Sequence, residues 1–221
     1  MHVKESVWLE EQLRVIPDGD LFPLLDVGSS TEDFRSVVQP HLERNIYAPL
    51  RFRGGKVWHA DIKDSPGIDF VGDVCDPKFQ AQLSTVGVRS AMITNILHHV
   101  QDRDSLCGGV CACVPPGGYI IVSGPHRYPT HHDPIDTLFR PDVAELAACF
   151  PGTSLVAGAI INSGNWREWR KEERGGRGLA RAIARLVTPF YRPAKWWELA
   201  RQSPYMIRHI KAVAVVLRKD S

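Results

Sequence analysis

Polar residues that could bind a nucleoside recur where short apolar runs of the sequence end. Asp61, Asp73 and Asn95 stand near the ends of three successive runs, at residues 56–62, 69–74 and 90–96. A carboxylate in the first position can accept hydrogen bonds from both hydroxyls of a ribose, and one in the second can accept from an exocyclic amine. If the runs are parallel strands, their carboxyl ends border one crevice. The three side chains therefore predict a nucleoside-binding site.

The segment Asp26-Val-Gly28-Ser-Ser30-Thr-Glu32 is typical of a turn from a buried strand into a helix. Free N–H groups and the helix dipole converge at such a turn, and glycine lets a ligand approach the backbone. The turn can therefore bind a carboxylate or a phosphate. An ordinary tight turn is the alternative. A nicotinamide dehydrogenase is disfavoured, because the full Gly-x-Gly-x-x-Gly fingerprint is missing.

Candidate bases come from the histidines, because five of the nine lie between residues 98 and 132. They fall in two segments that should open on the same crevice, so we expect His99 and His131, one from each segment, to be the catalytic bases. Helix capping and loop hydrogen bonding are the alternatives. A metal site is less favoured, because no spaced ligand pair fixes its geometry. Its candidate ligands are His126, His131, His132, Asp133 and Asp136.

The elements that must position these residues alternate along the chain. Strands are expected at residues 21–28, 56–62, 69–74, 90–96, 118–123, 154–161 and 211–217. Helices are expected at residues 3–15, 32–45, 77–85, 102–114 and 141–149. This alternation predicts an α/β fold with a doubly wound, mostly parallel sheet of seven strands. We expect one domain over residues 1–221, with a helical insertion at residues 163–209 between the last two strands.

The chain resembles the class I S-adenosylmethionine-dependent methyltransferases, in particular their small-molecule, methyltransferase type 11-like branch. The matching motifs are Leu25-Asp-Val-Gly28, Ala60-Asp-Ile62, Val71-Gly-Asp-Val74, Thr94-Asn-Ile-Leu-His-His-Val100 with Asp102, and Pro115-Pro-Gly-Gly-Tyr-Ile-Ile-Val-Ser123. They span roughly residues 21 to 161 in the order that the family has them. The resemblance implies a Rossmann-like fold and S-adenosylmethionine as the cofactor.

The resemblance also assigns roles to the residues of these motifs. Asp26 and Gly28 would shape the methionine end of the cofactor site. Ser30 stands where the family usually has a glycine, but its own hydroxyl and backbone N–H can donate to the cofactor carboxylate. Asp61, with Ile62 beside it, would bind the ribose. Asp73 and Val74 would bind the adenine, and Asn95 would line the sulfonium region.

Methyl transfer from a sulfonium requires alignment of the acceptor and, for a hydroxyl, removal of its proton. We therefore expect a methyltransferase that acts on a small molecule or glycan, with O-methylation as the reaction. The alternative is a methyltransferase-like binding or scaffold protein, because Ser30 and Glu32 stand where the family has loop glycines.

The net charge of +2 conceals an uneven distribution. Residues 163–209 contain eleven Lys/Arg and four Asp/Glu, a balance of +7, together with four tryptophans. The segment is interpreted as a lid, with an anionic or lipid-linked acceptor and peripheral membrane contact as further possibilities. A nucleic acid is the least favoured partner.

The opening residues and the cysteines bear on the compartment. Residues 1–12 are charged, and no run approaches the roughly 18 apolar residues of a membrane span. The five cysteines form no Cys-x-x-Cys pair, so reduced thiols are expected. A cytoplasmic protein is therefore predicted.

Overall fold

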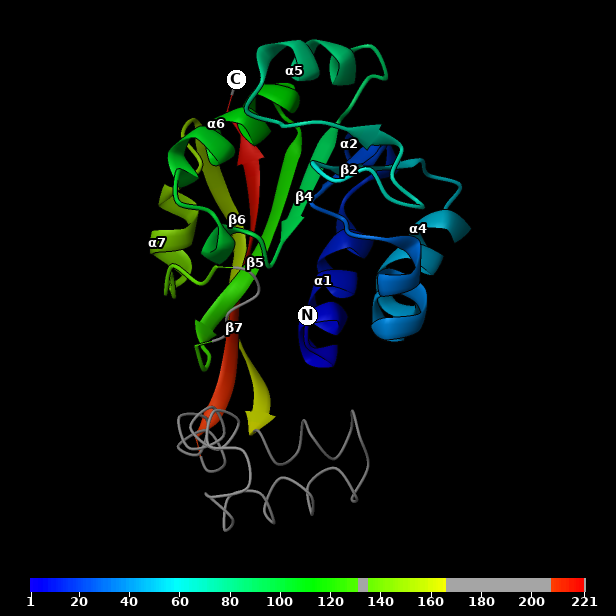
Figure 1. Cartoon of the computed structure of the whole chain (residues 1–221). Coiled ribbons are helices and arrows are strands. Elements are labelled where there is room, and N and C mark those ends of the chain that lie inside the picture. Colours follow the sequence, from blue (N-terminus) through cyan, green and yellow to red (C-terminus); the bar gives the residue numbers. More distant parts are fainter. Residues whose placement is uncertain (131–134, 166–207, 221) are drawn as a thin grey trace.

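The computed structural model describes residues 1–130, 135–165 and 208–220. Its centre is one sheet of seven strands in the order β3-β2-β1-β4-β5-β7-β6 (Figure 1). The strands are β1 (Leu24–Val27), β2 (Val57–Asp61), β3 (Phe70–Val71), β4 (Ser90–Thr94), β5 (Tyr119–Arg127), β6 (Thr153–Asn165) and β7 (His209–Lys219). The first five strands are parallel, whereas β7 runs antiparallel to both β5 and β6. The predicted doubly wound, mostly parallel sheet is confirmed.

Several strands differ in length from the prediction. The run at residues 21–28 contributes only β1, because Asp18–Leu21 form the short helix α2. The strand expected at residues 69–74 is reduced to the two residues of β3. The last three strands are longer than predicted, because β7 pairs in antiparallel orientation along the added residues of both β5 and β6.

Three helices follow the predicted boundaries closely, namely α5 (Pro77–Ser84), α6 (Arg103–Cys113) and α7 (Val143–Ala148). Each begins after an aspartate whose carboxylate accepts a hydrogen bond from a backbone N–H of the first turn, at Asp76, Asp102 and Asp142. The predicted amphipathic helix at the start of the chain is also present, as α1 (Val3–Val15).

The single helix predicted over residues 32–45 is wrong. The structure has a π-helical turn, η1 (Phe34–Val38), and then α3 (Pro40–Leu42), η2 (Glu43–Tyr47) and α4 (Ala48–Phe52). Gln39 separates the two parts with φ −124° and ψ 70°. The cause is Pro40, which disfavours helical dihedrals in the residue before it and supplies no N–H.

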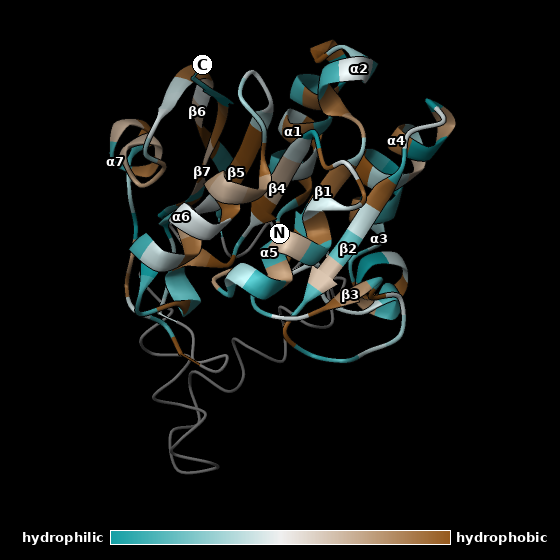
Figure 2. Ribbon diagram, turned by 90° about the horizontal axis from the view of Figure 1, so that it is seen from above, coloured by the Kyte–Doolittle hydropathy of each residue, from teal (hydrophilic) through white to brown (hydrophobic). Residues whose placement is uncertain are grey.

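Helices cover both faces of the sheet, and two hydrophobic clusters lie beneath them (Figures 1 and 2). Side chains of a strand alternate between faces, so Ala91 and Ile93 of β4 join the cluster under α5, α6 and α7. Met92 joins the cluster under α1 and η2. Burial on both faces explains why the central strands read as continuous apolar runs.

The predicted helical insertion at residues 163–209 falls mostly outside the described residues, because only its ends belong to β6 and β7. Within the described ranges, no helix has the length and apolar character needed to cross a membrane.

Candidate functional site

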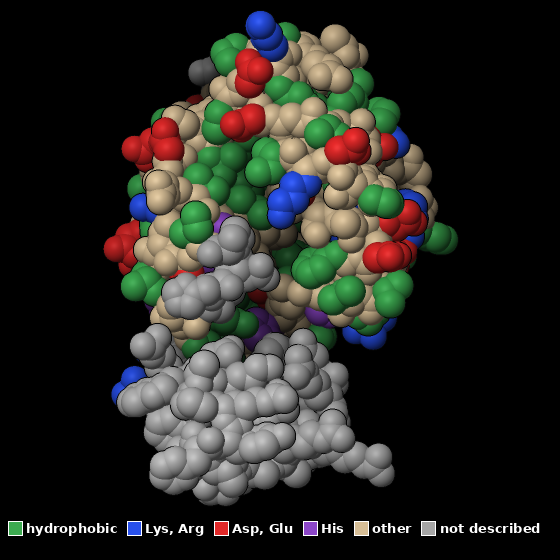
Figure 3. Space-filling model, viewed as in Figure 1, with side chains coloured by type: hydrophobic (Ala, Val, Ile, Leu, Met, Phe, Trp, Pro, Cys, Tyr) green, Lys and Arg blue, Asp and Glu red, His purple; other side chains and the backbone are tan. Residues whose placement is uncertain are grey.

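A cavity of about 930 Å³ lies at the carboxyl ends of the parallel strands. All eight residues predicted to bind the cofactor line it: Asp26, Gly28, Ser30, Asp61, Ile62, Asp73, Val74 and Asn95. His99 lines it as well. The surface is hollowed near the centre of the face in Figure 3, and hydrophobic side chains border the hollow. The sheet thus brings together side chains that are up to 73 residues apart in the sequence.

The turn after β1 has the backbone conformation of a glycine-rich loop. Gly28 has φ +70°, and a Cβ on it would lie 2.6 Å from Cδ1 of Ile96. Ser30 also takes a left-handed conformation, with φ +57°, although it carries a side chain. Its N–H donates to Asp61 Oδ2 at 3.1 Å. Both positions therefore keep the loop close to the ends of β2 and β4.

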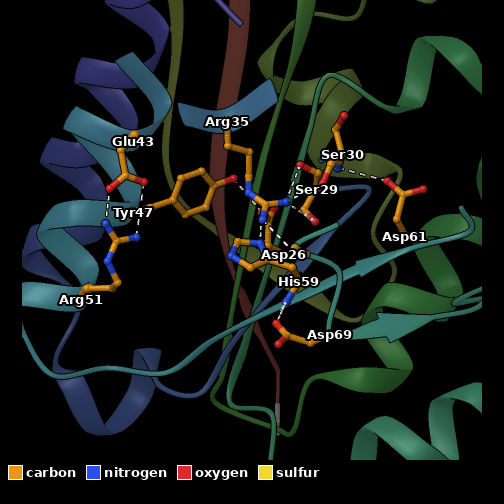
Figure 4. Close-up of polar contacts among 11 residues, drawn as sticks. Asp26, Ser29, Ser30, Arg35, Glu43, Tyr47, Arg51, His59, Asp61 and Asp69 are labelled. Atoms are coloured by element: carbon orange, nitrogen blue, oxygen red, sulfur yellow. Dashed lines mark hydrogen bonds and ion pairs between the residues drawn. The ribbon is translucent and has the colours of Figure 1, made fainter. Parts of the chain in front are cut away.

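The buried guanidinium of Arg35 holds this loop in place (Figure 4). Arg35 is 5% exposed, and its Nη1 donates to the carbonyl oxygens of Ser29 and Ser30. Its Nη2 donates to the carbonyl oxygen of Gly67 at 2.8 Å. The loop after β2 is thereby tied to the loop after β1. Sequence reasoning missed Arg35, because an arginine one turn into a helix ordinarily lies on a solvated face.

Asp26 forms a second buried network at the end of β1 (Figure 4). It is 1% exposed, and its Oδ2 accepts from the Tyr47 hydroxyl at 2.7 Å and lies 3.2 Å from His59 Nδ1. Burial, with Asp26 close by, raises the pKa of Tyr47 well above its ordinary value, so the hydroxyl remains a donor. The Asp26 carboxylate is thus held by the protein's own side chains.

The carboxylates of Asp61 and Asp73 are held by backbone N–H groups. Asp61 Oδ2 accepts from Ser30, and Asp61 Oδ1 accepts from the N–H of Lys63 at 3.0 Å. Asp73 Oδ1 accepts from the N–H of Cys75 at 2.9 Å. Each carboxylate oxygen has more than one acceptor position, so these bonds orient Asp61 and Asp73 and still allow a ligand to donate to them.

Of the two histidines predicted to be bases, the structure describes only His99. His99 lies in the 3₁₀ turn η3 (Leu97–His99), and its Nδ1 contacts the carbonyl oxygen of Ile135. A carbonyl only accepts, so Nδ1 carries the hydrogen, and Nε2 is the basic nitrogen of neutral His99. His131 lies outside the described residues.

Of the remaining histidines, His98 is 3% exposed, and its ring lies 3.9 Å, centroid to centroid, from that of His99. His126 Nδ1 contacts the carbonyl oxygen of Pro141 at 2.8 Å. Three of the candidate metal ligands, at positions 131–133, lie outside the described residues. The described ranges contain no cluster of side chains that could bind a metal ion.

No protein-family model matches the chain, and no curated protein sequence matches it. Solved structures do match. Coclaurine N-methyltransferase, in complex with N-methylheliamine and SAH, aligns with TM-score 0.55 and 11% identity over 97% of this chain and 70% of that one. MccD protein aligns with TM-score 0.51 and 13% identity over 97% and 96% of the two chains.

A provisionally assigned sarcosine dimethylglycine methyltransferase from Galdieria sulphuraria aligns with TM-score 0.50 and 10% identity over 98% of this chain and 85% of that one. At such low identities these alignments concern the fold. The chain has the Rossmann-like fold of the class I methyltransferases.

Proposed function

We propose that the protein is an S-adenosylmethionine-dependent methyltransferase that acts on a small molecule. The observation that carries this proposal is the cavity, in which two backbone-held carboxylates, Asp61 and Asp73, lie beside the tight loop at Gly28. Its volume of about 930 Å³ lies toward the upper end of the usual range for ligand sites, so it is large enough for a nucleoside and a small second substrate.

The residues present fit such a cofactor in chemical type. Asp61 would accept hydrogen bonds from the ribose hydroxyls and Asp73 from the adenine amine, while Ile62 and Val74 would contact the base. The Ser30 hydroxyl would donate to the methionine carboxylate, because the N–H of Ser30 already donates to Asp61 Oδ2. When bound, S-adenosylmethionine supplies an already activated methyl group, so the protein's task is mainly alignment.

His99 is the proposed general base for a hydroxyl acceptor. Its Nδ1 contact with Ile135 fixes the ring tautomer and leaves Nε2 as the basic nitrogen. The His99→Ala variant should lose about a hundredfold in turnover and keep its cofactor affinity. Transfer of a radiolabelled methyl group to a panel of hydroxyl and amine compounds measures this. Unchanged turnover would exclude His99 as the base.

The acceptor class is proposed on sequence grounds. The +7 balance of residues 163–209 favours an anionic or lipid-linked small molecule or glycan, with O-methylation as the reaction. Residues 166–207 of that segment, the proposed lid, lie outside the described residues.

A binding or scaffold protein is the second candidate, because Ser30 and Glu32 replace loop glycines. Two observations weigh against an impaired loop. Ser30 adopts φ +57°, a conformation that glycine would supply, and Glu32 is exposed. The replacements therefore do not prevent the loop from closing on Asp61.

Calorimetric titration with S-adenosylmethionine tests the proposal. Asp61→Ala should weaken binding by roughly tenfold or more, because hydrogen bonds to a charged group are lost. Asp64→Ala is the matched control, since Asp64 carries the same charge three residues further on, is exposed and does not line the cavity. Circular dichroism verifies that both variants fold. If the wild-type protein does not bind S-adenosylmethionine at concentrations up to millimolar, a methyltransferase function is excluded.

A further inference from the structure

A buried carboxylate from the first helix reaches the end of the central strand. Glu5 of α1 is 1% exposed, and its Oε1 accepts from Asn95 Nδ2 at 2.7 Å and from Ser123 Oγ at 2.6 Å. Its Oε2 accepts from the N–H of His2 at 3.2 Å. Asn95 and Ser123 are 90 and 118 residues away in the sequence, so this contact exists only in the folded protein.

These contacts determine which way the Asn95 amide faces. An ionised carboxylate can only accept, so the atom of Asn95 that meets Glu5 must be the donor Nδ2. The Asn95 backbone is fixed too, because its N–H donates to the Ser123 carbonyl oxygen at 2.8 Å and its φ is +57°. Asparagine is one of the few side-chain-bearing residues that tolerate this left-handed conformation.

Asn95 Oδ1 then lies on the other side of the planar amide. Asn95 lines the cavity together with Thr94 and Ile96, whereas Glu5 does not. Among the described residues, no donor to Asn95 Oδ1 is present. Asn95 Oδ1 can therefore accept a hydrogen bond from a ligand in the cavity.

We propose that Glu5 is a positioning residue of the methyl-transfer site, which holds Asn95 Oδ1 toward the place of the transferred methyl group. There Asn95 Oδ1 accepts a hydrogen bond from an N–H or O–H of the methyl acceptor, and so aligns the nucleophile. This inference rests on the proposed function. It predicts selection for acceptors whose nucleophilic atom carries a hydrogen, and against carboxylates.

Two cofactor analogues probe this position without a known acceptor. Sinefungin carries an amine in place of the transferred methyl group, whereas S-adenosylhomocysteine has no group there. Calorimetry should give a sinefungin preference in the wild type. Asn95→Ala and Glu5→Ala should each reduce the ratio of the two affinities by roughly tenfold or more.

The controls separate positioning from simple stabilisation. Glu11→Ala removes an exposed carboxylate of the same helix, which does not line the cavity, so the affinity ratio should stay unchanged. Glu5→Gln retains an oxygen that can accept from Asn95, and it should restore the ratio to within about threefold of the wild type. Glu5→Leu fills a similar volume without an acceptor, and it replaces Glu5→Ala if that variant does not fold.

The Asn95 side-chain amide provides a second readout by nitrogen-proton NMR, assigned from the signal lost in Asn95→Ala. The chemical shift of this amide should change in the Glu5 variants and stay unchanged in Glu11→Ala. An unchanged affinity ratio in Asn95→Ala and Glu5→Ala alike, with both analogues bound, would overturn the role of Glu5 and Asn95. Wild-type protein that binds neither analogue would instead overturn the proposed function itself.

Discussion

At the scale of single residues, the cavity depends on polar side chains that are satisfied within the protein. Asp26 is the clearest case, because a 1% exposed carboxylate without donors would be costly. Tyr47 and His59 surround it, and Arg35 Cζ lies 5.7 Å from the centre of the Tyr47 ring. The same group of residues thus supports both the end of β1 and the loop that follows it.

Removing one hydroxyl from this group should lower stability. Tyr47→Phe keeps the ring and deletes the donor to Asp26, so the free energy of unfolding should fall by about 1.5–3 kcal/mol, as for bonds to charged groups. Urea denaturation measures the change. Tyr119→Phe is the control, since no hydrogen bond of its hydroxyl to the described residues is present. Equal losses in both variants would refute this account of Asp26.

At the scale of elements, the junction between β1 and the following helical turn is the most constrained part of the site. Gly28→Ala should lower stability by about 1–2 kcal/mol for the left-handed conformation alone, and the contact with Ile96 adds to this. It should also weaken S-adenosylmethionine binding, because the loop must shift. Thermal unfolding and calorimetry measure the two effects.

A second variant separates the two causes. Ile96→Val removes Cδ1, the atom 2.6 Å from the added methyl group, and leaves φ at position 28 unchanged. The double variant Gly28→Ala with Ile96→Val should therefore recover part of the stability that Gly28→Ala loses. Ile96→Val alone is the reference, and losses that simply add in the double variant would show that the contact with Cδ1 contributes nothing.

The elements also differ in how well sequence predicts them. Asp61, Asp73 and Asn95 could be placed at one edge, because each ends an apolar run and parallel strands align those ends. The break at Gln39 follows from Pro40 and could have been predicted from that residue. The lengths of β5, β6 and β7 could not, because strand ends depend on the pairing partner, which the local sequence does not specify.

At the scale of the whole molecule, contacts between distant segments complete the site. Arg35 bonds to Gly67, and Glu5 bonds to Asn95 and Ser123. Nothing in the local sequence around Arg35 or Glu5 distinguishes them from residues of a solvated helix face. Their roles arise from tertiary packing. Sequence patterns therefore indicated the carboxylates at the strand ends, but they did not indicate Arg35, which holds the loop after β1, or Glu5, which holds the Asn95 amide.

The uneven charge of the chain gives a prediction at this same scale. Reversing Arg177, Arg181 and Arg185 to Glu changes the balance of residues 163–209 from +7 to +1. If the segment attracts an anionic partner, apparent acceptor affinity should weaken and lose much of its salt dependence, because exposed charges are screened over about 10 Å at 0.1 M salt. Cofactor affinity should stay unchanged. Acceptor kinetics at low salt test for an anionic substrate. Co-sedimentation with anionic vesicles at low salt tests for a membrane surface.

The control must change the net charge equally without touching that segment. Lys4, Arg14 and Lys78 are exposed, and reversing them to Glu also shifts the charge by six units. Loss of vesicle binding only in the 177/181/185 variant would indicate a membrane surface, since a general charge effect would appear in both variants. Loss of acceptor affinity alone would indicate an anionic substrate. If neither quantity responds in either variant, the positive charge of residues 163–209 attracts no partner and belongs to a solvated surface.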